Sequence, residues 1–380
     1  MIATRAALLA LAALTLAGCS SKAKVREPAE LTELQTVSVR PQVAWRRDAG
    51  HGEGDWVSAL HPRLESDGLF VADRRGQVSA FDPASGALLW QVQTGARLIS
   101  GPGVSGNAVL LGTLDGEVLA LKRADGSRLW TARLSSEVLG TPVGDGDVVV
   151  ARSVDGRVQG LSAVSGERLW TFDRSVPNLV LRGSSAPLIV GRSVLLGMDN
   201  GRVASLRLAD GQPEWEQAIA VPSGRTELDR LTDIDASLIE GPGCVYVASV
   251  GNELACIDAG SGQTQWRREI RSHAGMTLAG DRLYVSDDAG VVWGLDATSG
   301  AAIWKQEGLG HRRLSAPAAF GGFVVVGDFE GYLHWLDPSD GRLVGRLRLG
   351  SDGLRSPPVA GPGALFVLNR EGRLSAVRLP

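Results

Sequence analysis

Residues 109–130 read Val-Leu-Leu-Gly-Thr-Leu-Asp-Gly-Glu-Val-Leu-Ala-Leu-Lys-Arg-Ala-Asp-Gly-Ser-Arg-Leu-Trp, and this stretch decides the fold. Two short apolar runs each lead to an Asp-Gly pair, and a Trp follows the second pair by four residues. Asp-Gly between alternating apolar residues is a strong signal for a β-hairpin turn. We therefore expect strands over 108–113, 117–122 and 128–134, with a further strand over 99–104 before them.

The same unit recurs along the whole chain. Its final position is a Trp in all copies but one, and a Gly precedes this position by four residues in every complete copy. A turn residue, Gly or in one copy Asn, precedes it by 14 residues, and both types tolerate the positive φ of tight turns. Successive copies lie 38–51 residues apart, close to the length of a four-stranded propeller blade. The final positions are Trp45, Trp90, Trp130, Trp170, Trp215, Trp266, Trp304 and, where the Trp is lost, Gly345.

The two ends of the sequence complete one blade. Trp45 arrives with an outer strand only, whereas the last unit stops after its third strand, near residue 378. We expect the N-terminal strand to fill this place, because a closed ring leaves no free sheet edge. The sequence therefore predicts an all-β protein, an eight-bladed β-propeller of four-stranded antiparallel blades over residues 43–380. Each Trp is expected to pack between adjacent blades.

The first 18 residues have the pattern of a secretory signal. Arg5 is their only charge, an apolar run covers 6–16, and Leu-Ala-Gly precedes Cys19. The run is shorter than the roughly 20 apolar residues of a transmembrane helix. Leu-Ala-Gly-Cys resembles the lipobox of bacterial lipoproteins, which implies a signal peptide over 1–18 and lipidation of Cys19. Because Ser20 stands where many inner-membrane lipoproteins have Asp, the resemblance implies an outer-membrane lipoprotein that faces the periplasm.

Residues 19–42 show no sustained apolar pattern. Charged residues and Pro28 interrupt them, so we expect a lipidated N-terminus and a flexible tether that leads to the propeller. Fully extended, the tether would reach about 75–80 Å from the lipid.

Composition and spacing exclude several function classes. The formal net charge of −3 provides no basic surface for nucleic acid. The His residues are scattered without the spacing of a zinc site, and no Ser/His/Asp set stands out, so we expect no metal, no cofactor and no catalytic residue. Cys244 and Cys256 flank one expected hairpin of a secreted chain. The sequence leaves their disulfide open, because a shift of one residue in register would place them on opposite faces.

Two connections between blades are longer than the others, one after Trp170 and one after Trp215. Each leads from an outer strand to the inner strand of the next blade, so we expect both on one face of the ring, side by side. The first holds residues 177–183, Pro-Asn-Leu-Val-Leu-Arg-Gly, and the second holds residues 225–235, Arg-Thr-Glu-Leu-Asp-Arg-Leu-Thr-Asp-Ile-Asp. Exposed apolar side chains beside charged ones indicate a protein-binding surface. The alternative is a pair of loops that only stabilise or plug the ring.

The repeats resemble the PQQ-type propeller, which also occurs in quinoprotein dehydrogenases. As a family those enzymes carry an adjacent Cys pair, calcium ligands and a catalytic Asp, and no two Cys are adjacent in this chain. With the lipobox, the tether and eight blades, three segments resemble the family of the outer-membrane assembly factor BamB. Residues 177–183 read Pro-Asn-Leu-Val-Leu-Arg-Gly, 228–235 read Leu-Asp-Arg-Leu-Thr-Asp-Ile-Asp, and 327–335 read Gly-Asp-Phe-Glu-Gly-Tyr-Leu-His-Trp.

This resemblance implies a non-enzymatic scaffold subunit of the outer-membrane β-barrel assembly machinery. In that family the propeller binds the POTRA region of BamA, the insertase subunit. The contact motifs of the family correspond here to Leu179, Leu181, Arg182, Asp233 and Asp235. Unfolded outer-membrane β-barrel proteins are a further candidate partner. A periplasmic propeller scaffold for another envelope complex and a quinoprotein dehydrogenase-like enzyme are the alternatives.

Overall fold

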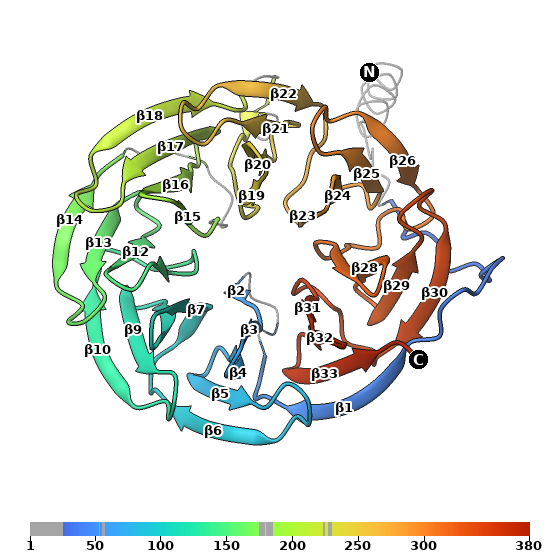
Figure 1. Ribbon diagram of the computed structural model, residues 1–380, viewed down its shortest axis with the longest axis horizontal. Coiled ribbons are helices and arrows are strands. Elements are labelled where there is room, and N and C mark those ends of the chain that lie inside the picture. The colour runs from blue at the N-terminus through green and yellow to red at the C-terminus, as the bar shows by residue number, and fades with distance from the viewer. Residues whose placement is uncertain are drawn as a thin grey trace, which may run out of the picture.

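A ring of eight β-sheets around a central axis makes up the protein (Figure 1). The computed structural model describes residues 26–52, 54, 58–174, 179, 185–222, 225–226 and 230–380. Each sheet is a blade whose main strands run antiparallel, from an inner strand near the axis to an outer strand at the rim. The described residues therefore confirm the predicted all-β, eight-bladed propeller.

Blades 1 to 4 follow one another in sequence order. Blade 1 has β3 (Arg63–Glu65), β4 (Gly68–Ala72), β5 (Gln77–Phe81) and β6 (Leu88–Gln93). Blade 2 has β7 (Leu98–Ser105), β8 (Ala108–Thr113), β9 (Glu117–Lys122) and β10 (Arg128–Arg133). Blade 3 has β11 (Val143–Gly144), β12 (Val148–Arg152), β13 (Val158–Ser162) and β14 (Arg168–Phe172). Blade 4 has β15 (Leu188–Val190), β16 (Ser193–Gly197), β17 (Arg202–Arg207) and β18 (Pro213–Ala218).

Blades 5 to 8 complete the ring. Blade 5 has β19 (Ile239–Gly241), β20 (Cys244–Ala248), β21 (Leu254–Ile257) and β22 (Thr264–Arg268). Blade 6 has β23 (Gly275–Ala279), β24 (Arg282–Ser286), β25 (Val292–Asp296) and β26 (Ala302–Gln306). Blade 7 has β27 (Ala318–Phe320), β28 (Phe323–Gly327), β29 (Tyr332–Leu336) and β30 (Leu343–Arg348). Blade 8 has β31 (Val359–Gly361), β32 (Ala364–Leu368), β33 (Arg373–Arg378) and β1 (Gln42–Asp48).

Blade 8 joins the two ends of the described chain. β1 pairs antiparallel with β33, and Trp45 lies opposite Ala376. The N-terminal strand thus supplies the outer strand of the last blade, as the split repeat predicts (Figure 1).

Blade 2 has a fifth strand, which the four-stranded repeat does not predict. β2 (Ala59–Leu60) pairs in parallel with β7 on its inner edge. The next residue, His61, donates its backbone N–H to Gly101 O at 3.2 Å, and Ser356 Oγ donates to Leu60 O from the link between blades 7 and 8. This segment therefore links blade 2 with the connection between blades 7 and 8, on either side of blade 1.

One Trp fastens each of seven blades to the next, and we call these contacts the Trp latches. Trp130 on β10 is 7% exposed, and its indole Nε1–H donates to Ala163 O in the turn between β13 and β14 at 2.9 Å. The expectation that the Trp side chains pack between blades is confirmed. The other latches join Trp45 to Pro83, Trp90 to Arg123, Trp170 to Leu208, Trp215 to Ala259, Trp266 to Ala297, and Trp304 to Pro338.

The Gly that stands four residues before each latch position is required by the Trp of the preceding blade. Gly262 has a φ of +73°, and a Cβ atom there would lie 2.5 Å from Cε3 of Trp215. Real Cβ atoms do not approach carbon this closely. The same collision with a Trp ring applies at Gly86, Gly126, Gly166, Gly211, Gly300 and Gly341.

Blade 7 is the exception, because its Trp lies on the third strand and not on the fourth. In blade 3 a small residue on the third strand, Gly160, lies opposite Trp170, whereas in blade 7 Trp335 on β29 lies opposite Gly345 on β30. Trp335 is fully buried, and its Nε1 has no hydrogen-bond partner among the described residues. A latch here would need a turn between β33 and β1. Since those strands come from opposite ends of the described chain, no such turn joins them.

Part of the segment expected as a tether is held against the ring. Ala29 N donates to Gly310 O at 2.8 Å, and Ser38 N and Val39 N both donate to Val344 O. Residues 29–39 therefore differ from the expectation of a flexible tether. Residues 19–25, including Cys19, lie outside the described residues.

Cys244 and Cys256 form a disulfide, which the sequence left open. They lie on the paired strands β20 and β21, and their Cα atoms are 5.7 Å apart. Both side chains are buried in the core between blades 5 and 6. The bridge therefore links neighbouring strands of one blade.

Replacement of a latch-contacting Gly should cost more stability than replacement of a Gly with the same φ in open space. Gly243 has a φ of +77° and no atom within 4 Å of an added Cβ, so Gly243→Ala should cost only the ~1–2 kcal/mol of left-handed strain. Gly262→Ala should cost a further ~1–3 kcal/mol, because the methyl group meets the Trp215 ring. Urea unfolding of both variants measures the difference, and equal destabilisation would contradict this role of the Gly.

Candidate functional site

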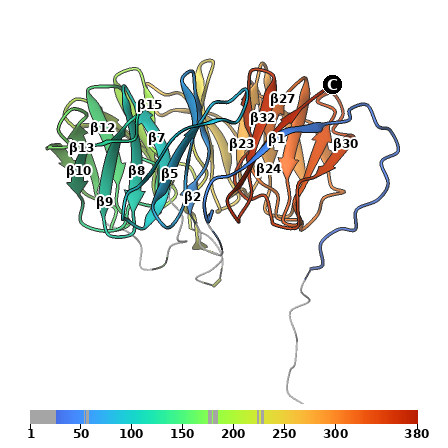
Figure 2. The same ribbon diagram turned by 90° about the horizontal axis from the view of Figure 1, so that it is seen from below.

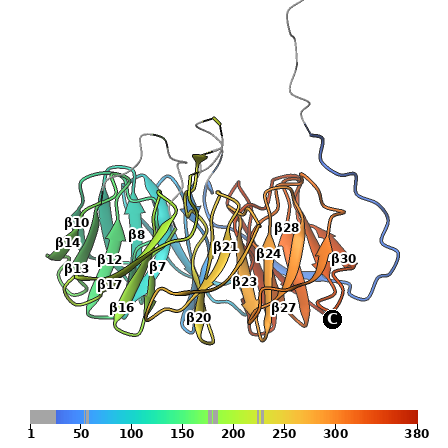
Figure 3. The ribbon, with the colours of Figure 1, turned by 90° about the horizontal axis from the view of Figure 1, so that it is seen from above.

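The two long connections lie on the same face of the ring. In every blade the outer strand leads to the inner strand of the next blade on one side, which also carries the turns between second and third strands. We call this side the loop face. The described parts of the β14–β15 and β18–β19 connections belong to it (Figures 2 and 3). The described parts of both connections therefore lie on one face of the ring, as the sequence predicts.

The residues expected on the first connection are only partly described. Leu179 is 45% exposed, which is high for a leucine. Leu181 and Arg182 lie outside the described residues. Their role as partner contacts stays a prediction.

Both connections converge on β16 of blade 4. A Cβ added to Gly197 would lie 2.5 Å from Ser185 Oγ, at the end of the first connection, and 2.5 Å from Ile234 Cγ2, in the second. Ile234 is fully buried there, and its N–H donates to Met198 O at 3.3 Å. The absence of a side chain at Gly197 thus lets the two connections come together.

The two aspartates expected as contact residues differ in their exposure to solvent. Asp233 is buried, with 1% of its surface exposed, and its carbonyl accepts a hydrogen bond from Val250 N at 3.0 Å in the neighbouring blade 5. Asp235 is partly exposed, and its Oδ1 has no hydrogen-bond partner among the described residues. Of the two, Asp235 is the one that reaches the surface.

Asp235 lies in a strongly acidic environment. Burial, followed by the nearby carboxylates of Asp233 and Asp199, raises the pKa of Asp235 to about 7. Asp199 is itself held by Arg152, whose Nη2 donates to Asp199 Oδ2 at 2.5 Å while Nη1 donates to Gly197 O. Since Arg152 is already paired in this buried contact, it only partly offsets the charge of Asp235.

Further charged groups lie toward blade 6, and one of them, His273, partly offsets the rise in the pKa of Asp235. His273 Nδ1 and Asp288 Oδ1 are 2.6 Å apart, and this hydrogen bond raises the pKa of His273. Arg271 pairs with the other oxygen of Asp288 at 3.1 Å. Charged groups therefore form an arc on the loop face that runs from Arg152 in blade 3 to Asp288 in blade 6.

Sequence patterns did not single out Arg152, Asp199, His273 or Asp288. Arg152 is the last residue of β12, and Asp199 follows the end of β16 by two residues. His273 belongs to a connection of unremarkable length. Their proximity to Asp235 arises from four different blades or links, and no local motif records it.

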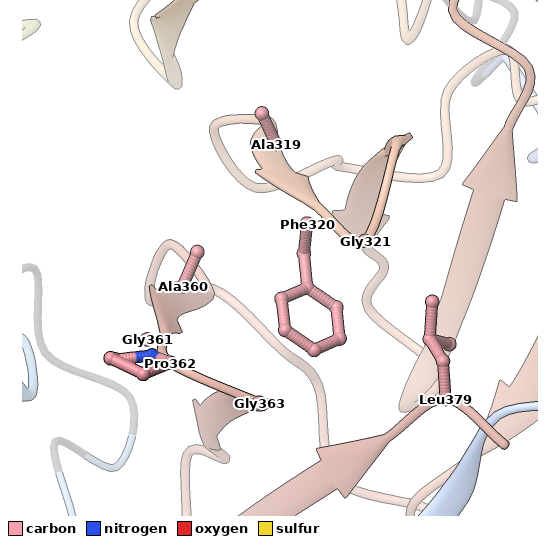
Figure 4. Close-up of a pocket in the computed structure, with 8 residues that line it drawn as sticks. All are labelled: Ala319, Phe320, Gly321, Ala360, Gly361, Pro362, Gly363 and Leu379. Carbon is pink, nitrogen blue, oxygen red and sulfur yellow. The ribbon is translucent and has the colours of Figure 1, made fainter.

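The opposite face has a different character. A shallow apolar hollow lies there between the β27–β28 and β31–β32 turns, and Phe320, Pro362 and Leu379 line it (Figure 4). Among the described residues no cluster of three or more His, Cys, Asp or Glu side chains is placed to hold a metal ion. No described helix has the length and apolar character to span a membrane.

Solved structures with the same ring include both assembly factors and enzymes. The crystal structure of BamB from Moraxella catarrhalis matches with a TM-score of 0.80 and 26% identity, over 89% of this chain and 100% of that one. A europium-containing methanol dehydrogenase matches with a TM-score of 0.72 and 14% identity, over 90% of this chain and 93% of that one. At that identity the second likeness shows the fold alone.

Comparison with sequence relatives distinguishes an assembly factor from an enzyme. The outer membrane protein assembly factor BamB of Pseudomonas aeruginosa is 50% identical over 372 residues, which cover 98% of this chain and 97% of the relative. The family model described as outer membrane protein assembly factor BamB matches residues 74–306 and 294–378. Membership of a family of assembly factors supports the prediction that this chain is not an enzyme. The chain belongs to the family of the outer membrane protein assembly factor BamB.

Proposed function

We propose that the protein is a lipid-anchored scaffold subunit of the β-barrel assembly machinery, which binds the POTRA region of BamA through its loop face between blades 3 and 5. It assists the folding and insertion of outer-membrane β-barrel proteins in this role. The approach of Ser185, which follows the first motif by two residues, and Ile234, within the second motif, to Gly197 supports the proposal. The anchor is the lipid on Cys19, which holds the propeller on the periplasmic side of the outer membrane.

The chemistry of this surface suits a partner with apolar and basic side chains. Leu179 offers exposed apolar area, and Asp235 offers a carboxylate that its own surroundings leave undercompensated. A cation from the partner would relieve the repulsion that Asp235 experiences from Asp233 and Asp199. Charge complementarity of this kind also selects the correct partner and orientation.

The proposed contact residues lead to a direct binding test. Leu181→Asp combined with Arg182→Glu should abolish co-purification of BamA, and Leu179→Asp alone should weaken binding about tenfold or more, since a charge in an apolar contact costs over 1.4 kcal/mol. Pull-down of BamA from membranes and titration with its purified POTRA region measure the two effects.

A matched control uses the far side of the ring. Val164 is 87% exposed in the turn between β13 and β14, on the face opposite the loop face. Val164→Asp introduces the same charge and should leave BamA binding unchanged. Normal binding by the Leu181 and Arg182 double variant, or equal loss with Val164→Asp, would show that the partner surface lies elsewhere.

Asp235 should show opposite effects on stability and on binding. Its pKa is raised in the folded protein, so the stability linked to its protonation is present below pH 3.8 and is lost as the pH rises through about 7. Asp235→Asn removes this loss and should increase the free energy of unfolding by ~1–3 kcal/mol at pH 8, with little change at pH 4, after allowance for solvent screening. The same variant should weaken POTRA binding.

Asp147→Asn provides the comparison, because Asp147 is exposed in the turn between β11 and β12 on the opposite face. Unfolding curves at pH 4, 6 and 8 should be unchanged in this variant. A purely structural Asp235 would alter stability without altering affinity, and that result would remove it from the binding surface.

A further inference from the structure

The third family motif, residues 327–335, lies outside the proposed binding surface and has no role in it. It belongs to blade 7 and runs from the end of β28 through the following turn into β29. Asp328 and His334 are both fully buried, although neither touches the long connections. Such buried polar groups are retained only where they hold something in place.

The motif holds the N-terminal segment through two arginines. Arg312 Nη1 donates to Ala29 O at 2.8 Å, and Arg346 Nη1 donates to Thr32 O at 3.0 Å. Ala29 N also donates to Gly310 O at 2.8 Å. We call residues 29–41 the strap.

Asp328 and His334 fix both arginines. Arg312 Nε donates to Asp328 Oδ2 at 2.8 Å, and its Nη2 donates to Glu330. His334 Nε2 lies 2.9 Å from the same Asp328 oxygen, while Arg346 Nε donates to His334 Nδ1 at 3.4 Å. Burial lowers the pKa of His334, and the neutral imidazole suits this arrangement, since one ring nitrogen donates and the other accepts. The five side chains thus form one connected network that contacts the strap.

The far end of the strap fills the place of the missing latch. Val39 is 6% exposed and packs in the core cluster of Trp335, Val344 and Val377, which belongs to blades 7 and 8. A Cβ added to Gly345 would lie 2.5 Å from Val39 Cγ1. Val39 therefore occupies the space beside the position where the other blades carry a Trp.

We propose that the strap is a clasp, which closes the junction between blades 7 and 8 in place of a Trp latch and makes the chain leave the ring on the loop face. Gly310 and Arg312 belong to the connection between β26 and β27, which lies on that face. In the side views the N-terminal segment runs past β30 toward the same face as the described parts of the long connections (Figures 2 and 3).

The clasp shortens the free segment of chain between the lipid on Cys19 and the propeller. From Cys19 to Ala29 the chain reaches at most about 33–36 Å, whereas a free segment up to Gln42 would reach about 75–80 Å. The loop face, with the proposed BamA surface, is then the side of the ring nearest the membrane. This orientation rests on the lipid anchor of the proposed function, whereas the clasp itself does not.

Two variants of one segment test the clasp. Val39→Asp should release the strap, while Val37→Asp places the same charge on a residue that is 50% exposed and should leave it bound. Hydrogen exchange of the mature lipoprotein should show Ser38 and Val39 amides protected about 100-fold or more in wild type and Val37→Asp, and near the free-peptide rate in Val39→Asp. Gly345→Ala adds a methyl group that would collide with Val39, so this variant should also release the strap. It provides a second test in case Val39→Asp does not fold.

Energy transfer to the bilayer tests the orientation. Donor dyes at Glu371→Cys, in a loop-face turn, and at Val164→Cys, on the opposite face, are compared on protein bound to phosphatidylethanolamine and phosphatidylglycerol vesicles that carry acceptor lipids. We expect stronger transfer from position 371 in wild type and in Val37→Asp. In Val39→Asp the difference between the two positions should largely disappear.

Each negative result contradicts a different part of the proposal: the clasp, the orientation or the lipid anchor. Unprotected Ser38 and Val39 amides in wild type would overturn the clasp. Protected amides with equal transfer from both positions, or with stronger transfer from position 164, would overturn the orientation. Failure of the mature protein to float with vesicles would contradict the lipid anchor, and the orientation with it, while the amide exchange would still decide the clasp.

Discussion

The indole of one Trp, seated against a turn of the next blade, is the contact on which the ring depends. A four-stranded blade has two faces and cannot bury both by itself, so neighbouring blades must share a core. The cluster around Trp130 shows this, because it unites Leu110 and Val118 of blade 2 with Val149 and Leu161 of blade 3. The indole N–H adds direction to this apolar contact, since its acceptor is a fixed carbonyl of the following blade. The latch thereby sets how far each blade stands from its neighbour.

The junction between blades 7 and 8 lacks a Trp latch, and the reason lies in the way the ring closes. A latch from blade 7 has no turn to bind, because the outer strands of blade 8 come from distant parts of the chain. Trp335 has moved to the third strand, and Val39 of the strap packs beside Gly345. Closure of the ring and attachment of the N-terminal segment are therefore one structural event. The polar network of Arg312, Asp328 and His334 belongs to this junction.

A rigid ring also explains how the proposed binding surface tolerates unfavourable charge. Asp199, Asp233 and Asp235 come from one strand end and one connection, and the packed blades hold them close despite their repulsion. Burial, followed by the charges of Asp233 and Asp199, raises the pKa of Asp235, and this raised pKa is a cost to stability at neutral pH. Such a cost is tolerated at functional surfaces, because a partner that supplies opposite charge recovers it on binding. On the opposite face, charged side chains such as Arg123 with Asp67, and Arg282 with Asp281, are paired with one another.

The sequence by itself determined the number of blades, the strand order, the closure by the N-terminal strand and the face that carries both long connections. These features follow from two fixed spacings, and both spacings have a local physical cause: a Gly that permits a positive φ and a Trp that needs a Gly beside it. The family motifs pointed to Leu179 and Asp235 as partner contacts, and this role stays a prediction. Only the tertiary structure decided that Asp233 is buried, that the two Cys are bridged, that β2 joins the inner edge of blade 2 and that the strap is bound.

These outcomes share one reason. They depend on contacts between segments that are far apart in the sequence, such as Thr32 with Arg346 or Leu60 with Ser356, and no local pattern encodes such a meeting. Spacing along the chain predicts what repeats, because each blade meets its neighbour in the same way. What occurs once, at the junction of blades 7 and 8 and around Asp235, is set by the closed ring that brings those segments together.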